Sequence, residues 1–132
     1  MHQSVRIGSW ITIHHMAVAE VMASAGFDWL CLDMEHTVTD LYDMQVMLAT
    51  IQSFGVKAYV RVGGNEAMQI KRVLDAGADG IICPMIQSAE QARQLVSHCK
   101  YPPQGTRGVG LARAQRYGLD EGFESYRDQI AP

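Results

Sequence analysis

Apolar residues follow two different spacings along this 132-residue chain. Short, nearly continuous apolar runs are rich in Ile, Val, Leu and aromatic residues, which is typical of buried β-strands. Between these runs, apolar residues recur three and four positions apart, as in the stretch 18–25, which predicts helices with one apolar face. The pattern therefore predicts a strand followed by a helix, four times over. The predicted strands are 7–13, 29–34, 57–62 and 80–85.

The residues that flank the helical patterns support these assignments. Asp40, Asn65 and Ser88 each precede a pattern, and a short polar side chain there can accept a hydrogen bond from a free N–H of the first turn. A glycine follows three of the patterns, where a left-handed residue commonly ends a helix. These glycines are Gly26, Gly55 and Gly77.

The strand–helix order implies a parallel sheet with helices packed outside it. The segment 24–35, "SAGFDWLCLDME", lines up with the segment 75–86, "DAGADGIICPMI", so the chain repeats itself after two strand–helix units. Units of this length are typical of a (β/α)8 TIM barrel, which needs about 250 residues for eight units. We therefore predict an α/β fold of TIM-barrel type, with residues 1–132 forming the N-terminal half of the barrel domain. Paired half-barrels or a smaller open sheet are the alternatives.

The last third of the chain has a different composition. Residues 101–118, "YPPQGTRGVGLARAQRYG", are rich in Gly, Pro and Arg, which predicts a long functional loop. Within it, "RGVGLAR" (107–113) is either a cradle for an anion or a tight loop with solvated arginines. The pattern of 120–132 predicts a short helix.

Composition excludes several classes of partner. The net charge is −3 and the pI is about 5.9, so the chain lacks the basic surface that nucleic acid requires. No apolar run approaches the roughly 18 residues of a membrane span, and the first residues show no signal-peptide pattern. The three cysteines are scattered, and two lie within apolar runs, so we expect a cytoplasmic protein without disulfides.

The second predicted strand ends in ionisable residues, because "CLDMEHT" (31–37) contains Asp33, Glu35 and His36. Sites in parallel α/β sheets form at the carboxyl ends of the strands. Asp33 lies between apolar residues, so we expect it to be buried and hydrogen-bonded. His36 either bonds to a backbone carbonyl or acts chemically, and its place after two carboxylates favours the chemical role. Glu35 is either solvated or orients His36.

Three further residues complete the candidate site. Arg61 ends the third predicted strand, where its planar guanidinium forms a surface salt bridge or meets a carboxylate or enolate oxygen. Trp10 lies in the first strand and is expected at the same mouth. Asp75 stands in the last turn of a helix, where a negative charge opposes the helix dipole unless a cation or donor meets it. His36 is a candidate for that partner.

Together these residues and several longer motifs resemble the metal-dependent class II pyruvate aldolases. This is the 4-hydroxy-2-oxoheptanedioate aldolase family, which is related to the citrate lyase beta chains. The resemblance covers nearly the whole chain. Its marks are "GSW" (8–10), "AGFDWLCLDMEH" (25–36), "VRV" (60–62), "QIKRVLDAGADGIICPM" (69–85) and "YPPQGTRGVG" (101–110).

The resemblance implies a lyase that reversibly cleaves a 4-hydroxy-2-oxo acid into pyruvate and an aldehyde, through a metal-bound pyruvate enolate. The family's catalytic histidine falls on His36, and its enolate-stabilising arginine falls on Arg61. The aspartate that raises the basicity of the histidine falls on Asp75. Trp10 and Arg61 are the expected substrate-binding residues.

The cofactor that the resemblance implies is a divalent metal, Mg, Mn or Co, which acts as a Lewis acid on pyruvate. The family's metal ligands, a glutamate and an aspartate, fall C-terminal to Pro132. We therefore expect no metal ligand in this chain and no activity from its 132 residues alone.

Two other functions remain open from the sequence. One is a citrate-lyase-like enzyme that cleaves an acyl-CoA thioester, although the "D-x-E-H" strand end favours the aldolase. The other is a non-catalytic half-barrel fragment or assembly module, whose open edge strands pair with another copy. For the aldolase we expect a homo-oligomer that binds neither nucleic acid nor membranes.

Overall fold

The computed structural model of the chain describes residues 5–119. The helix predicted for 120–132 lies outside these residues. No helix in the described part is long and apolar enough to cross a membrane. Strands and helices alternate as predicted, and the elements are β1 (Gly8–Ile11), α1 (Met16–Ser24), β2 (Trp29–Asp33), α2 (Leu41–Ser53), β3 (Lys57–Arg61), α3 (Ala67–Asp75), β4 (Gly80–Ile82), α4 (Ala89–Cys99) and the 3-10 helix η1 (Arg113–Gly118).

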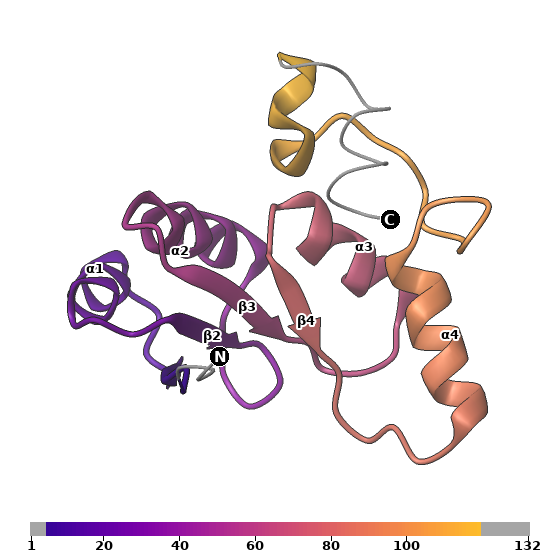
Figure 1. Ribbon diagram of the computed structural model, residues 1–132, viewed down its shortest axis with the longest axis horizontal. Helices are drawn as coiled ribbons and strands as arrows, with labels where there is room; N and C mark the ends of the chain where they lie inside the picture. Colours follow the sequence, from indigo (N-terminus) through magenta and orange to yellow (C-terminus); the bar gives the residue numbers. More distant parts are fainter. Residues whose placement is uncertain (1–4, 120–132) are drawn as a thin grey trace.

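The four strands form one parallel sheet in the order β1-β2-β3-β4, so each strand pairs with its neighbour in the sequence. The helices follow in chain order beside the strands (Figure 1). Helix α1 packs against α2, α2 packs against β3, and α3 packs against both β4 and α4. This confirms the prediction of parallel strands with helices outside them.

One face of the sheet carries the hydrophobic core, because alternate residues of a strand point to opposite faces. Leu30 and Leu32 of β2 and Val60 of β3 are fully buried under the helices. Burying an aliphatic side chain of this size stabilises a fold by about 1.5–3 kcal/mol. Helix α2 supplies the largest share of the opposing layer, through Met44, Met47, Leu48 and Ile51.

The opposite face of the sheet carries the candidate site. The register pairs Trp10 with Cys31 and Asp33 with Arg61, so these four residues share this face. Gly8 is the first residue of β1, and a Cβ there would lie 2.0 Å from the Trp29 ring. Glycine is therefore required at the start of β1.

The helix ends match most of the predicted caps. Asp40 and Ser88 accept hydrogen bonds from backbone N–H groups in the first turns of α2 and α4. The three predicted glycines all have positive φ, and they are Gly26, Gly55 and Gly77. Asn65 was expected to cap α3, and this is wrong, because Glu66 holds that position without a side-chain bond. The Asn65 amide instead donates to the backbone of Gln91 on α4.

The predicted loop 101–118 contains the 3-10 helix η1 and begins with a buried tyrosine. Tyr101 is buried, and its hydroxyl accepts a hydrogen bond from Gln115, the one buried residue of η1. The loop therefore closes over α3 and α4 instead of extending freely. The fourth strand is shorter than predicted, because it ends at Ile82, before Pro84.

Candidate active site

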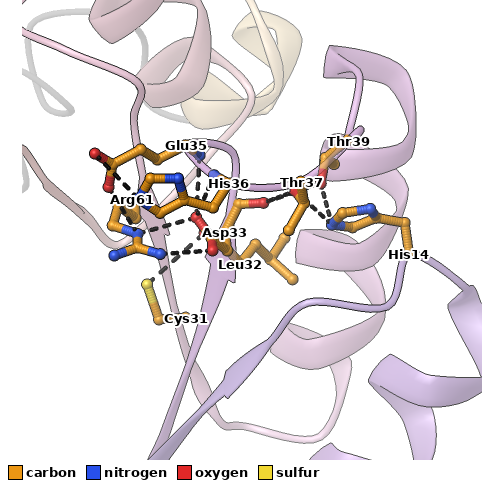
Figure 2. Close-up of polar contacts among 9 residues, drawn as sticks. All are labelled: His14, Cys31, Leu32, Asp33, Glu35, His36, Thr37, Thr39 and Arg61. Carbon is orange, nitrogen blue, oxygen red and sulfur yellow. Dashed lines mark hydrogen bonds and ion pairs between the residues drawn. The ribbon is translucent and has the colours of Figure 1, made fainter.

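Asp33 and Arg61 meet at the carboxyl ends of β2 and β3 (Figure 2). Arg61 donates from Nε to Asp33 Oδ1 at 2.9 Å and from Nη2 to Asp33 Oδ2 at 2.6 Å. Two parallel bonds between a guanidinium and a carboxylate fix both groups in one plane. The guanidinium is therefore held in place before any substrate arrives.

Asp33 is the buried centre of this arrangement, with 2 % of its surface exposed. Its Oδ1 also accepts the backbone N–H groups of Glu35 and His36, at 3.0 and 3.3 Å. The Arg61 hydrogen bonds lower the pKa of Asp33 to about 2, and the two N–H groups help to outweigh the opposing effect of burial. Asp33 is thus a carboxylate that folds the following loop and orients Arg61.

Glu35 and His36 are presented by that loop. Glu35 Oε2 lies 3.2 Å from Arg61 Nε, while its Oε1 lies 3.6 Å from His36 Nε2. Glu35 is therefore placed between the two candidate catalytic groups. The His36 side chain is 70 % exposed, so its ring is open to solvent at the mouth of the sheet.

Trp10 lies against Arg61, whose guanidinium carbon is 4.7 Å from the centre of the Trp10 ring. Such a cation–π contact leaves the edge of the guanidinium free while it covers the face. Cys31 lies below on the same face, and burial raises the pKa of its thiol to about 11. Cys31 therefore stays protonated and is not a nucleophile.

The sequence suggested His36 as the partner of Asp75. The structure does not bring these two residues together within this chain. Helix α3 runs back along the sheet, so Asp75 at its end lies at the level of the strands' amino ends, whereas His36 follows the carboxyl end of β2. The cation that meets Asp75 is Arg107, whose Nη2 donates to Asp75 Oδ1 at 2.7 Å. The Arg107 side chain is 2 % exposed and its guanidinium stacks on Tyr101.

The first arginine of "RGVGLAR" is therefore buried in the fold instead of solvated. Arg113, at the end of the same motif, donates to the backbone carbonyl of Ala76 at 3.0 Å. Both arginines thus serve the carboxyl end of α3, where positive charge is favourable.

Sequence reasoning missed the second half of the polar network. Thr37 and Thr39 reach back to the backbone carbonyl of Asp33, and His14 contacts both threonines from the loop after β1. The signal was present in the sequence, because threonines just after a strand commonly bond to nearby backbone. Nothing in the sequence indicated that His14 would join them.

The described residues contain no cluster of three or more His, Cys, Asp or Glu side chains that could hold a metal. The two carboxylates nearest the mouth, Asp33 and Glu35, are both paired with Arg61. The residues present therefore do not by themselves make a metal site.

Comparison with known proteins identifies the family. Residues 6–128 match the model of the family described as HpcH/HpaI aldolase/citrate lyase. The chain belongs to this family. It is 43 % identical over 122 residues to 2-dehydro-3,6-dideoxy-6-sulfogluconate aldolase of Pseudomonas putida, covering 92 % of this chain and 48 % of that protein. It is 40 % identical over 123 residues to 4-hydroxy-2-oxovalerate aldolase of Novosphingobium aromaticivorans, covering 92 % of this chain and 46 % of that protein.

Solved structures give the same result for the fold. A HpcH/HpaI aldolase/citrate lyase family protein from Burkholderia cenocepacia superposes with a TM-score of 0.87 at 32 % identity, covering 96 % of this chain and 51 % of that one. The chain thus spans about half the length of the relatives it matches. The predicted architecture of TIM-barrel type, with four strand–helix units in this chain, is confirmed.

Proposed function

We propose that the protein containing this chain is an aldolase that reversibly cleaves a 4-hydroxy-2-oxo acid into pyruvate and an aldehyde. One observation carries the proposal: a guanidinium is rigidly held at the carboxyl edge of the sheet, beside an exposed imidazole. The relatives described above are named as aldolases that act on 2-oxo acids or related compounds. Family and site geometry therefore support the same reaction.

Arg61 is proposed to stabilise negative charge on the oxygen of the pyruvate enolate. Its contacts within residues 5–119 use Nε and Nη2, which leaves Nη1 for a substrate oxygen. A donor fixed in advance stabilises developing charge without reorganisation during the reaction. Trp10 covers the face of the guanidinium, and we propose that it also forms one wall for the substrate.

His36 is proposed to move the proton between the aldol hydroxyl and solvent. An imidazole can both accept and donate a proton, and this one is exposed at the mouth with Glu35 beside it. Glu35 restricts the ring from the Arg61 side, so its proposed role is to orient His36. Asp75 was predicted to raise the basicity of His36, and that role stays a prediction, because it requires a contact that this chain does not make by itself.

A divalent metal, Mg, Mn or Co, belongs to this proposal as the Lewis acid of the reaction. The residues described here do not form its site, so no step is assigned to it. The ligands are proposed to lie C-terminal to Pro132, as the resemblance implies. A homo-oligomeric state and a cytoplasmic location complete the proposal, and the three free cysteines agree with that location.

The proposal is tested by pyruvate release from 4-hydroxy-2-oxo acids, with Mg, Mn or Co present, and by exchange of the pyruvate methyl protons with deuterated water. The protein should catalyse both reactions, and His36→Ala should slow cleavage by about 10²–10⁴-fold, because a proton shuttle is lost. The matched control is His98→Ala on α4, where the imidazole bonds to Asn65 in the loop after β3 and not to Glu35 or Arg61. His98→Ala should leave cleavage unchanged.

The alternatives give different results in the same experiment. Cleavage of a citrate-type acyl-CoA thioester without pyruvate release would reject the aldolase in favour of the citrate-lyase-like enzyme. Absence of both activities, with self-association in gel filtration, would favour the assembly module. Full activity of His36→Ala would show that the charges of "CLDMEHT" are structural.

A further inference from the structure

The loop between β2 and α2 folds back on Asp33 from two sides. The Asp33 carboxylate accepts the N–H groups of Glu35 and His36. The backbone carbonyl of Asp33 accepts the hydroxyl groups of Thr37 and of Thr39, the latter at 3.1 Å. Asp33 therefore fixes both parts of the loop: its carboxylate holds residues 35–36, and its carbonyl holds the two threonines.

His14 joins this arrangement from a different loop, the one between β1 and α1. Its Nε2 lies 3.3 Å from the Thr37 hydroxyl oxygen and makes a closer hydrogen bond with the Thr39 hydroxyl. Figure 2 shows His14 on the side of the loop away from Arg61, with Asp33 and Thr37 between them. Two neighbouring strand ends are thus joined by one imidazole and two hydroxyls.

The positions of the two threonine hydroxyl hydrogens determine whether His14 Nε2 donates or accepts a hydrogen bond. Each threonine has one hydroxyl hydrogen, and the two hydroxyl oxygens, 2.9 Å apart, both face the Asp33 carbonyl. These hydrogens are used by the carbonyl or by the neighbouring hydroxyl, so the threonine oxygens offer lone pairs to His14. On this assignment of the hydroxyl hydrogens His14 donates from Nε2, because two facing lone pairs would repel.

From this geometry we infer that His14 is a positioning residue for Glu35 and His36. It acts through Thr37 and Thr39, which fix the Asp33 carbonyl and with it the loop that presents both side chains. This inference rests on the proposed function, since it assigns His14 to the same site. His14 itself touches neither Arg61 nor His36 in the contacts of the described residues.

Two pairs of variants test the inference on the protein in the absence of substrate. His14→Leu removes the donor, whereas His14→Gln keeps an N–H at a similar reach. Thr39→Val removes a hydroxyl at nearly constant volume. Its matched control is Thr50→Val in α2, where the hydroxyl also donates to a backbone carbonyl, that of Val46 at 3.0 Å, but lies outside the site.

His14→Leu and Thr39→Val should speed hydrogen exchange of the Glu35 and His36 amides by about three- to tenfold, as expected when a hydrogen bond that holds the loop is lost. His14→Gln and Thr50→Val should leave exchange at these amides near the wild-type rate. Nitrogen NMR of the imidazole should show His14 protonated at Nε2. Should Thr39→Val fail to fold, the comparison of His14→Leu with His14→Gln decides.

Unchanged exchange in His14→Leu, or an unprotonated Nε2, would overturn the inference. In the active protein, His14→Leu should lower kcat by about three- to tenfold with little change in KM, and His14→Gln should restore it. A change in KM alone would reject the positioning role. If the wild-type protein releases no pyruvate, the proposed function fails, while exchange and NMR still decide the role of His14 in the loop.

Discussion

The two ends of the sheet use the same kind of anchor for different purposes. At the carboxyl end, Asp33 of β2 pairs with Arg61 of β3. At the amino end, Asp79, just before β4, pairs with Lys57 of β3 at 2.6 Å and accepts the N–H of Ala58. Each aspartate thus links two neighbouring strands through a cation and backbone N–H groups.

The two cations differ in what they leave available. The Lys57 side chain is 59 % exposed, and its charge is a single point that Asp79 satisfies. Arg61 is stacked on Trp10 and fixed by Asp33, yet one edge of its guanidinium remains for another oxygen. The comparison teaches that an ion pair between strands becomes a candidate site when its cation has donors to spare and an imidazole nearby.

The largest expected effect is at Arg61. Arg61→Lys keeps the charge but loses the planar set of donors, so pyruvate release should fall by about 10²–10³-fold, or about 2.7–4 kcal/mol of transition-state stabilisation. Exchange of the pyruvate methyl protons should slow as well, because it requires the same enolate. Lys57→Arg is the mirror-image change at the amino end and should leave both rates unchanged. Equal rates in the two variants would remove the distinction between the two ends.

The next effect concerns the buried pair between Arg107 and Asp75, which lies towards the amino end. Arg107→Met removes a cation whose side chain is 2 % exposed and leaves Asp75 without its partner. Breaking a buried pair in this way should lower the free energy of unfolding by about 3 kcal/mol, measured by urea denaturation. Arg93→Met, which breaks an exposed pair with Glu90 on α4, is the control and should change stability by less than about 0.5 kcal/mol.

Acid should destabilise the carboxyl end in a defined pH range. The pKa of Asp33 is lowered from its ordinary value of 3.8 to about 2 in the folded state. The stabilisation is therefore complete above about pH 4, and it is lost as pH falls from there through about 2. The loss should be on the order of 2 kcal/mol. Asp33→Asn should flatten this part of the curve of unfolding free energy against pH, and an unaltered curve would contradict the lowered pKa.

The smallest effect is expected at Lys57. Lys57→Met removes one exposed partner of the pair with Asp79, which keeps its hydrogen bonds to Ala58 and to the Gln52 side chain. The free energy of unfolding should fall by about 0.2–1 kcal/mol, and pyruvate release should not change. A loss of activity here, measured alongside thermal unfolding, would mean that the amino end also takes part in the reaction.

The alternation of elements and most helix ends were predictable from the sequence because they depend on local rules. Apolar spacing located all four strands, and Asp40 and Ser88 marked helix starts through bonds within one turn. The burial of Asp33 followed from its apolar neighbours. Asp75 at the end of α3 was expected to meet a cation or a hydrogen-bond donor, and Arg107 is both.

The partners of these residues could not be predicted, because they depend on how distant segments meet. Asp75 finds Arg107, 32 residues away along the chain, instead of His36. The Asn65 side chain bonds to α4 and does not cap α3, because Gln91 and His98 lie within hydrogen-bond distance. His14 and Thr39, 25 residues apart, come together only once β1 and β2 are paired.

The order of the strands has a consequence for how the chain acquires its structure. Each of β2, β3 and β4 pairs with the strand before it in the chain, and a single helix separates the two, as the contacts across 21 and 28 residues show. Closing loops of this length costs only slightly more entropy than closing shorter ones, and it is fast compared with synthesis at about 5–20 residues per second. Each strand–helix unit can therefore dock on the one before it as it emerges from the ribosome. On this view the sheet grows one strand at a time, from the N-terminus, during translation.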